Sequence, residues 1–290
     1  MPPFHAIPGT PRNRKTVATA DREFEFSDRD FEQVRRLIHE HAGISLHPGK
    51  RHMVYSRVAR RLRATRLDRF ESYLGRLKED QREWQEFVNS LTTNLTSFFR
   101  EKHHFPLLAE HVLEHCKGRE ATIWSAACST GEEAWSIAMT LIDAYGSYKP
   151  PVKIVATDVD TNVLMHAEEG VYSLDRVSGI PPEDLKRFFL RGKGARDGLV
   201  RVRPELMNMV TFRPLNLLAE EWPVRPPFDA IFCRNVMIYF DKPTQRRVLA
   251  RMRGMLRPDA LLFAGHAESF SHAADLFRPR GKTVYVPTAA

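Results

Sequence analysis

Hydrophobic residues near the start of the chain recur with the spacing of an α-helix. They form one apolar stripe at Phe31, Val34, Leu37 and Ile38, as expected when about 3.6 residues complete a turn. Ser27 and Asp30 before this stripe resemble a capping box, and Gly43 after it is a typical helix stop. The pattern therefore predicts a first helix between Ser27 and Gly43.

Three further helical patterns follow before residue 93. The longest predicts a helix over residues 49–64, because apolar residues recur every four positions at Val54, Val58 and Leu62, with Tyr55 beside them. Shorter amphipathic stretches cover residues 69–78 and 82–92. We expect a small all-helical domain over residues 21–92, followed by an interdomain linker over residues 93–102.

The hydrophobic pattern changes after residue 103. Short β-branched or apolar runs at residues 121–126, 152–157, 228–233, 261–265 and 283–286 alternate with longer amphipathic stretches at residues 132–145, 161–169 and 243–256. This alternation is typical of β-α-β units. It predicts an α/β domain over residues 103–290, built on a mostly parallel, doubly wound sheet.

Two segments depart from these patterns. Residues 191–212 contain three glycines and then two strand-like runs, which predicts a small antiparallel β insertion at about residues 191–213. Residues 1–20 are rich in proline and show no periodicity, so they are predicted to form a flexible tail.

Composition excludes several classes of protein. The 290 residues are 42% hydrophobic, which excludes a mainly disordered chain. No stretch approaches the roughly 18 apolar residues of a membrane helix, and no signal peptide is evident. The three cysteines are widely separated, which supports neither a disulfide framework nor a zinc site. We therefore expect a soluble cytoplasmic protein without a metal ion.

Positive charge is concentrated in one predicted helix. The formal net charge is +8, which suggests nucleic acid, an anionic membrane surface or an acidic protein as the partner. Between residues 50 and 69 there is a single acid, Asp68, against eight basic residues: Lys50, Arg51, Arg57, Arg60, Arg61, Arg63, Arg66 and Arg69. On the helical wheel Arg57, Arg60 and Arg63 face away from the apolar side. A solvated basic face is the alternative interpretation.

Candidate chemistry lies where the predicted parallel strands end, because open α/β sheets bind ligands at those edges. The loop over residues 127–133 contains one glycine, Gly131, and two acids, Glu132 and Glu133. A nucleotide diphosphate favours several glycines and no acid there. Asp158, after the second strand, is placed to bind ribose hydroxyls. A cationic sulfonium compound, S-adenosylmethionine, suits this set, but the acids could instead complement a helix dipole or cap a helix.

Several longer segments resemble one family. In chain order TTNLTSFFRE, SAACSTGEEAWSIA, ATDVDTNVL, PLNLL and FDAIFCRNVMIYFD resemble the chemotaxis receptor glutamate O-methyltransferases of the CheR type. The resemblance extends into the helical domain through GISL and MVYSRVARRLR. One departure is Ala134, where the family usually has proline. The resemblance implies a Rossmann-like class I methyltransferase that esterifies glutamate side chains of chemoreceptors during chemotactic adaptation.

The same resemblance implies roles for individual residues. The catalytic group would be Arg100, Arg234 and Tyr239, beside the transferred methyl. S-adenosylmethionine, which leaves as S-adenosylhomocysteine, would be bound by residues of the linker and of the α/β domain: Asn94, Thr96, Arg100, Gly131, Glu133, Asp158, Asn216, Leu217, Cys233 and Arg234, with Glu132 as the less favoured alternative to Glu133. Glutamate, with an ordinary pKa of about 4.3, is already ionised at neutral pH, so the enzyme's main task is to position it.

Receptor contacts are also implied by the resemblance. Arg57, Arg60 and Arg63 would dock on an acidic helical bundle of the receptor's cytoplasmic region. The β insertion would pair with a peptide at the receptor C-terminus, using Gly192, Gly194, Gly198 and Arg201. Otherwise the insertion is a covered edge hairpin. We expect a monomer that is recruited to membrane chemoreceptors.

Two rival functions remain open from sequence alone. A nucleic-acid methyltransferase would explain the basic helix, but residues 234–237 read Arg-Asn-Val-Met rather than the Asn-Pro-Pro-Tyr type typical of base amino-group methylation. A non-catalytic cofactor-sensing protein would not need Arg100, Arg234 and Tyr239. We therefore expect an enzyme that does not act on nucleic acid.

Overall fold

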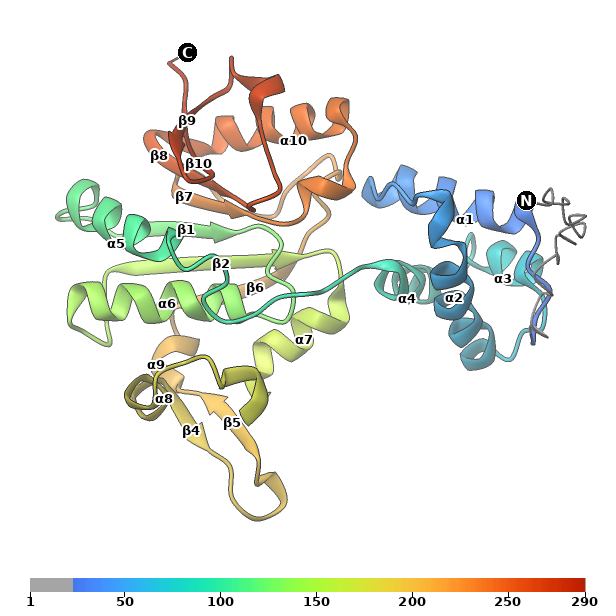
Figure 1. The fold of residues 1–290 in the computed structure, drawn as a ribbon, viewed down its shortest axis with the longest axis horizontal. Coiled ribbons are helices and arrows are strands. Elements are labelled where there is room, and N and C mark those ends of the chain that lie inside the picture. The colour runs from blue at the N-terminus through green and yellow to red at the C-terminus, as the bar shows by residue number, and fades with distance from the viewer. Residues whose placement is uncertain (1–22, 290) are drawn as a thin grey trace, which may run out of the picture.

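The structure, a computed structural model, describes residues 23–289 (Figure 1). The predicted tail over residues 1–20 lies outside the described residues. Within the described residues, no helix has the length and apolar character needed to cross a membrane. The predicted fold class is confirmed: a helical domain precedes an α/β domain that carries a small antiparallel sheet.

The helical domain, on the right of Figure 1, contains the first four helices. They are α1 (Asp28–Ala42), α2 (Arg51–Thr65), α3 (Phe70–Arg76) and α4 (Gln81–Leu91). Ser27 and Asp30 form the predicted capping box, and Gly43 ends α1 at a φ of 69°. The apolar stripes of α1 and α2 pack into one buried core with α3 and α4. The four predicted helices are thus confirmed, with small shifts at their ends.

The α/β domain is built on a seven-stranded sheet with the order β6-β2-β1-β7-β8-β10-β9. These strands are β1 (Ala121–Ser125), β2 (Val152–Asp158), β6 (Val210–Pro214), β7 (Phe228–Cys233), β8 (Leu256–Ala264), β9 (Phe277–Gly281) and β10 (Val284–Pro287). The first five in spatial order are parallel, whereas β10 is antiparallel to both of its neighbours. The prediction of a mostly parallel sheet is confirmed.

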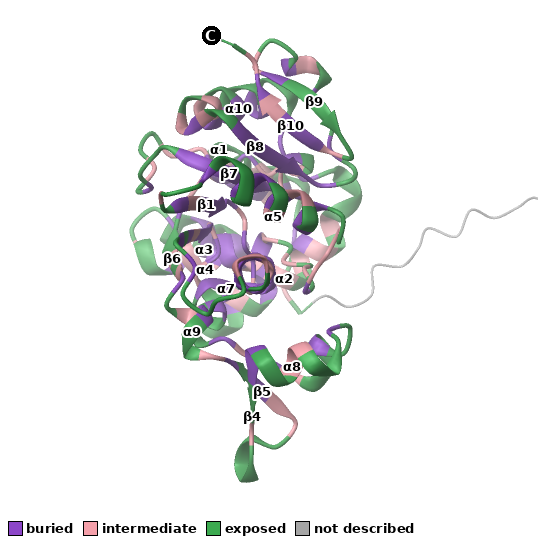
Figure 2. Ribbon diagram, turned by 90° about the vertical axis from the view of Figure 1, so that its left-hand side faces the viewer, coloured by how far each residue is buried: buried purple, intermediate pink, exposed green. Residues whose placement is uncertain are grey.

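Helices cover both faces of this sheet. α5 (His104–His115) and α6 (Glu132–Tyr145) pack on one face against Ile123 and Phe232, and α7 (Thr161–Glu169) contacts β2 and β6. α10 (Lys242–Met255) packs on the other face against Trp124 and Leu262. Figure 2 shows the resulting buried sheet between more exposed helices. The sheet is therefore doubly wound, and the covering helices change sides between β1 and β7.

The antiparallel insertion begins earlier than the sequence predicts. It is a three-stranded sheet with the order β3-β5-β4, formed by β3 (Val171–Ser173), β4 (Phe189–Arg191) and β5 (Leu199–Val202). α8 (Pro182–Phe188) precedes β4, and α9 (Pro204–Met207) follows β5. The expected range, residues 191–213, needs correction at both ends. Its second strand-like run is β6, which pairs in parallel with β2 at the edge of the main sheet.

Candidate cofactor and substrate site

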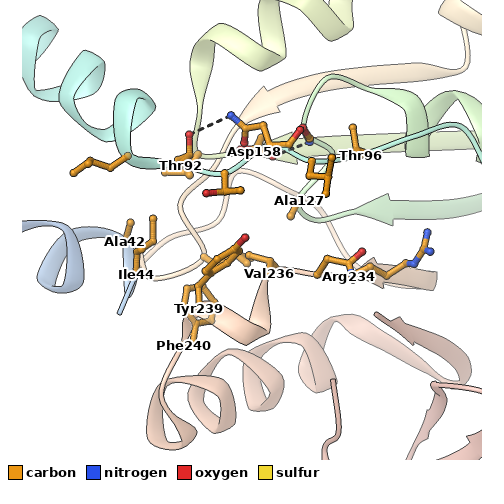
Figure 3. A pocket seen from close by; sticks show the side chains of 18 of the residues that line it. Ala42, Ile44, Thr92, Thr96, Ala127, Asp158, Arg234, Val236, Tyr239 and Phe240 are labelled. Atoms are coloured by element: carbon orange, nitrogen blue, oxygen red, sulfur yellow. Dashed lines mark hydrogen bonds between the residues drawn. The ribbon is translucent and has the colours of Figure 1, made fainter. Parts of the chain in front are cut away.

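The loops after β1 and β7 lie side by side at the point where the covering helices change faces. β1 and β7 are parallel neighbours, with Ser125 opposite Phe232, so their following loops leave the same edge of the sheet. Ligands of open α/β sheets bind at this point. A cavity of about 290 Å³ opens there, and its walls come from both domains and from the linker between them (Figure 3).

Asp158 is buried in the cavity wall at the end of β2. Its Oδ2 accepts a hydrogen bond from the Ser129 N–H at 2.8 Å, and its Oδ1 accepts one from the Asp160 N–H at 3.0 Å. Burial raises the pKa of Asp158 to about 6, although these amides favour the ionised form. A carboxylate with remaining lone pairs in a buried wall suits the hydroxyls of a ribose.

Glu133 and Arg234 form a buried ion pair across the strand ends. Arg234 Nη1 donates to Glu133 Oε2 at 2.9 Å, and Ser125 Oγ donates to the other oxygen of Glu133 at 2.7 Å. Arg234 Nη2 donates to the main-chain oxygen of Arg100 at 2.5 Å. Only 2% of the Arg234 side chain is exposed. Arg234 is therefore committed to contacts within the protein, and it points away from Tyr239 in Figure 3.

The linker is fastened to the start of α7 through Asp160. Asp160 Oδ2 accepts hydrogen bonds from Thr92 Oγ1 at 2.6 Å and from Asn94 Nδ2 at 2.7 Å. Ser129 Oγ donates to the main-chain oxygen of Asn94 at 3.1 Å. These bonds place Asn94 and Thr96 in the cavity wall. The Nδ2 group of Asn94 holds the linker in place. The predicted cofactor contact would therefore have to involve other atoms of Asn94.

Arg100 and Tyr239 also line the cavity, but their polar groups are less occupied. Both side chains are half-buried. Within the described residues the Arg100 side chain donates one hydrogen bond, from Nη1 to the Leu95 oxygen at 2.7 Å, and the Tyr239 hydroxyl makes none. The Tyr239 ring enters the cavity opposite Asp158 (Figure 3). We call Arg100 and Tyr239 the accessible group, and Asp158, Glu133 and Arg234 the buried group.

The helical domain closes the remaining side of the cavity. Asn216 Nδ2 donates to the His41 oxygen at 2.6 Å, and the Ser45 N–H donates to the Tyr239 oxygen at 3.0 Å. Gly43 has a positive φ of 69°, and a Cβ there would lie 2.9 Å from both Leu218 Cδ1 and Phe240 Cδ1. Glycine is therefore required for the close approach of the two domains.

Two of the predicted cofactor-binding residues do not line the cavity. Gly131 begins α6 with a φ of 95°, and a Cβ there would lie 2.8 Å from Ala167 Cβ and 3.0 Å from both Trp135 Nε1 and the Tyr172 hydroxyl. It is needed for packing. Cys233 is buried in the core on the α10 face, and burial raises the pKa of its thiol well above the usual value. The other predicted cofactor and catalytic residues all line the cavity.

One cluster could in principle hold a metal ion. Potential ligand atoms of Glu101, His103 and His104 lie within 4.8 Å of one another. However, Arg234 Nη2 lies 3.4 Å from Glu101 Oε2. Burial would raise the pKa of Glu101, but the His266 N–H and the charge of Arg234 lower it to about 2. The positive charge beside this carboxylate is already supplied by Arg234, which disfavours a metal ion.

Comparisons with known proteins identify the family. Residues 94–286 match the CheR methyltransferase SAM binding domain, and residues 29–92 match the CheR methyltransferase all-alpha domain. The chain belongs to the CheR methyltransferase family. It is therefore an S-adenosylmethionine-dependent methyltransferase, as predicted. The boundary between the two matches falls in the segment that contains Asn94.

Curated CheR relatives align over nearly the whole chain. Chemotaxis protein methyltransferase 2 of Pseudomonas aeruginosa is 52% identical over 278 residues, which cover 96% of this chain and 99% of the relative. Chemotaxis protein methyltransferase of Escherichia coli is 54% identical over 261 residues, covering 89% and 91%. The solved structure of PKMT2 from Rickettsia typhi with AdoHcy aligns at 17% identity and a TM-score of 0.32, covering 50% of this chain and 20% of that one.

The cavity of this CheR family member fits its cofactor chemically. Leu217, Val236 and Phe240 supply apolar surface suited to an adenine. Asp158 presents a carboxylate suited to ribose hydroxyls, and Glu133 presents one suited to a cationic head. Both acids line the cavity at the strand ends, where a diphosphate would bind, and their negative charge disfavours such a group.

The residues expected to contact a receptor have different environments. Arg57 Nη1 donates to the oxygens of Ser90 and Thr92 at 3.2 and 2.5 Å, so it closes the end of α4. Arg63 forms an exposed ion pair with Glu23, whose atoms approach to 2.5 Å. Arg60 is exposed, and its side chain donates no hydrogen bond to a described residue. The three basic side chains are therefore not equivalent.

In the β insertion, the three predicted glycines lie between β4 and β5. A Cβ at Gly192 would lie 2.0 Å from the Arg196 oxygen, and Gly194 and Gly198 have positive φ angles of 59° and 81°. These glycines therefore shape the connection. Arg201 lies on β5, which is the central strand and is paired on both sides. An added strand would have to pair with β3 or β4.

Proposed function

We propose that this enzyme transfers a methyl group from S-adenosylmethionine to glutamate side chains in the cytoplasmic region of chemoreceptors. The observation that supports this most directly is that one cavity combines the buried group with an accessible arginine and tyrosine. The buried group suits a cofactor that is the same in every turnover, and the accessible group suits a carboxylate of another protein. The names of the CheR relatives, chemotaxis protein methyltransferases, support a receptor as the substrate.

Positioning is the main requirement of this reaction. The substrate glutamate is a nucleophile without deprotonation, since its ordinary pKa is about 4.3. Arg100 would bind the carboxylate with its remaining N–H donors, and the Tyr239 hydroxyl would donate to the same group. When bound, the cofactor supplies an electrophilic methyl group on a sulfonium. A carboxylate oxygen forms the new bond to carbon as the carbon–sulfur bond breaks, and no proton has to move.

Arg234 would act differently from its predicted catalytic role. Its guanidinium is bound to Glu133 and to the Arg100 oxygen, and only 2% of the side chain is exposed, so its remaining N–H groups are shielded from a substrate carboxylate. We assign it the role of holding Glu133 toward the cofactor and the Arg100 main chain beside the substrate. This distinguishes a positioning arginine, Arg234, from a substrate-binding arginine, Arg100.

The cofactor contacts are proposed to follow the cavity walls. Asp158 would bind the ribose, and Glu133 the amino-acid head. Asn216 and Leu217 would border the adenine, while Asn94, Thr96 and Arg100 would contribute from the linker. Gly131 and Cys233 would act through packing, because neither lines the cavity.

Receptor docking is proposed to use the exposed basic side of α2. Arg60 and Arg63 can meet acidic receptor helices, and Arg63 can exchange its exposed partner Glu23 for a receptor carboxylate at little cost. Arg57 would remain bound to α4. Electrostatic contacts of this kind mainly steer association.

The β insertion is proposed to tether a receptor C-terminal peptide by strand addition. β4 is an edge strand and carries Leu190, which is 42% exposed. An extended peptide could pair with its free side. Arg201, opposite Leu190 in the sheet, could attract a terminal carboxylate. Calorimetry with such a peptide should detect binding to the enzyme, and absence of heat at high peptide concentration would reject the tether.

Release of methanol provides the functional test. The enzyme is incubated with methyl-labelled cofactor and a chemoreceptor cytoplasmic fragment, and the protein is then treated with alkali. Carboxyl methyl esters release labelled methanol, whereas methylated bases and amines do not. We expect volatile label with the receptor and none with RNA or DNA. Label that stays on the protein in alkali would contradict a methyl ester. Because all cavity residues come from one chain, we also propose that the monomer is sufficient for activity. We propose that it is cytoplasmic and is recruited to receptors.

A further inference from the structure

The segment that carries Tyr239 contains little regular structure of its own. It runs from Arg234 through the short turn Met237–Tyr239 to Asp241, where α10 is capped. Asn235 adopts a positive φ of 59°, which is uncommon for a residue other than glycine. A conformation of this kind persists when its surroundings hold it. The relevant contacts come from two side chains outside the segment.

Glu268, in the loop after β8, binds the amide side of this segment. Its Oε1 accepts from the Met237 N–H at 2.8 Å, and its Oε2 accepts from the Asn235 N–H at 3.0 Å and from the Gly265 N–H at 2.6 Å. The residue is only 6% exposed. Hydrogen bonds from amides to a buried carboxylate are stronger than neutral ones. Glu268 is not among the residues that line the cavity.

Gln245, in α10, binds the carbonyl side of the same segment. Its Nε2 donates to the Met237 oxygen at 2.8 Å and to the Phe240 oxygen at 3.1 Å. Lys242 Nζ donates to Gln245 Oε1 at 3.1 Å, which fixes the orientation of the amide. Gln245 and Glu268 are both buried, at 7% and 6% exposed. Met237 is thus held through its N–H by Glu268 and through its oxygen by Gln245.

We infer that Glu268 and Gln245 form a clamp that sets the position of the Tyr239 hydroxyl, and so are positioning residues for methyl transfer. This inference rests on the proposed function of Tyr239. The clamp acts on the chain two residues before Tyr239 and one residue after it. A displacement of about 1 Å at a reacting group can reduce a rate by about a hundredfold.

Kinetics of Glu268→Gln test the clamp. The amide keeps the size of the carboxyl but turns an acceptor into a donor that faces main-chain N–H groups. We expect kcat on the receptor fragment to fall about tenfold to a hundredfold, with affinity for S-adenosylhomocysteine changed less than about threefold. Asp275→Asn is the matched control, because it removes an exposed carboxylate that pairs with Arg246, and it should leave kcat unchanged.

A double-mutant cycle with Tyr239→Phe separates positioning from general stability. If Glu268 acts through the hydroxyl, Glu268→Gln should lower kcat by less than about threefold in the Tyr239→Phe background. The same fold loss in both backgrounds, or equal losses of kcat and cofactor affinity, would overturn the clamp. If Glu268→Gln does not fold, the same cycle is run with Gln245→Ala, which removes the donors from the carbonyl side.

Fluorine NMR of 3-fluorotyrosine provides a readout that does not require activity. Tyr239→Phe assigns the Tyr239 resonance in the labelled protein. We expect this resonance to shift or broaden in Glu268→Gln and to stay in place in Asp275→Asn. An unmoved Tyr239 resonance in Glu268→Gln would reject the clamp, whether or not the enzyme methylates a receptor. If the resonance shifts as expected but the wild-type enzyme does not methylate the receptor, only the proposed function is rejected.

Discussion

The buried and accessible groups of the cavity differ in how far the protein satisfies their charges. Arg234 exposes 2% of its side chain and meets Glu133, Glu101 and a main-chain oxygen. Arg100 is half-buried and makes one hydrogen bond within the described residues. The resemblance to the family implies that both arginines belong to one catalytic group. Under the proposed function, this difference means that the side assigned to the cofactor is preorganised, while the side assigned to the protein substrate keeps free donors.

The largest expected effect concerns the buried arginine. Arg234→Met would leave Glu133 and Glu101 buried without their cation, and breaking a buried pair in this way typically costs about 3–5 kcal/mol of unfolding free energy. Urea unfolding should show this loss, and S-adenosylhomocysteine binding should disappear. Arg246→Met, which breaks the exposed pair with Asp275, is the control and should hardly change stability. If Arg234→Met and Arg246→Met both lowered stability only slightly, the distinction between the buried and the exposed arginine would be contradicted.

The accessible group should show the opposite profile. Arg100→Ala and Tyr239→Phe should each reduce receptor methylation about tenfold to a hundredfold because the carboxylate loses a positioning contact. Their affinity for S-adenosylhomocysteine should change less than about threefold, and their stability should be retained. Calorimetry and initial rates measure the two quantities on the same preparations. If affinity fell as much as the rate, these residues would belong with the cofactor group.

The pH dependence of cofactor binding tests Asp158. Its pKa is raised to about 6 by burial, and ribose hydroxyls bind the ionised form better. Affinity should therefore rise as the pH rises through 6, and fall about tenfold between pH 7.5 and pH 5. Calorimetry with S-adenosylhomocysteine measures this. Asp158→Asn should bind weakly with a flatter profile, so an unchanged pH dependence in this variant would assign the titration to another group.

The contact between the domains can be tested at Gly43. Gly43→Ala should lower the free energy of unfolding by about 1–2 kcal/mol and weaken cofactor binding, because the new methyl meets Leu218 and Phe240. Gly118→Ala is a close control, since Gly118 has a φ of 76° with nothing within 4 Å of its Cβ position. The control reports the cost of the backbone conformation alone. Equal losses of cofactor affinity would show that packing at Gly43 does not shape the cavity.

The smallest effect on receptor methylation is expected for the basic residues of α2, which are exposed. Charge reversal at Arg60 and Arg63 should slow receptor methylation about threefold to tenfold and reduce its salt dependence, with cofactor binding intact. Arg69→Glu is the control, since its exposed partner is Glu71 and it lies beyond α2. Rates and salt dependence that match the wild type would support a merely solvated basic face.

The sequence predicts this fold well where the periodicity is strong. α1, α6, α7 and β7 carry a clear helical or strand pattern and local caps, so they lie close to the predicted residues. The pattern fails at β9, because its residues are largely exposed and leave no apolar run. It also merges β6 with the insertion, since a strand's sheet partner is a long-range property that neighbouring residues do not encode.

The candidate site can be predicted only where its residues lie in continuous segments of the sequence. Resemblance to the family locates Asp158, Glu133 and Arg100, which lie in continuous motifs and line the cavity. It does not show that Arg234 pairs with Glu133, because that contact joins residues about a hundred positions apart. Glu268 was missed, although an acid soon after the end of a parallel strand is a signal that the strand-end rule could have used.

The most direct test of the account is tandem mass spectrometry of a chemoreceptor cytoplasmic fragment after incubation with the enzyme and S-adenosylmethionine. The account predicts methyl esters on glutamate side chains with the wild-type enzyme, and a strong reduction of the same modified peptides with Tyr239→Phe at saturating cofactor. Methylation of lysine or arginine nitrogen, or glutamate esters formed equally well without the Tyr239 hydroxyl, would contradict it.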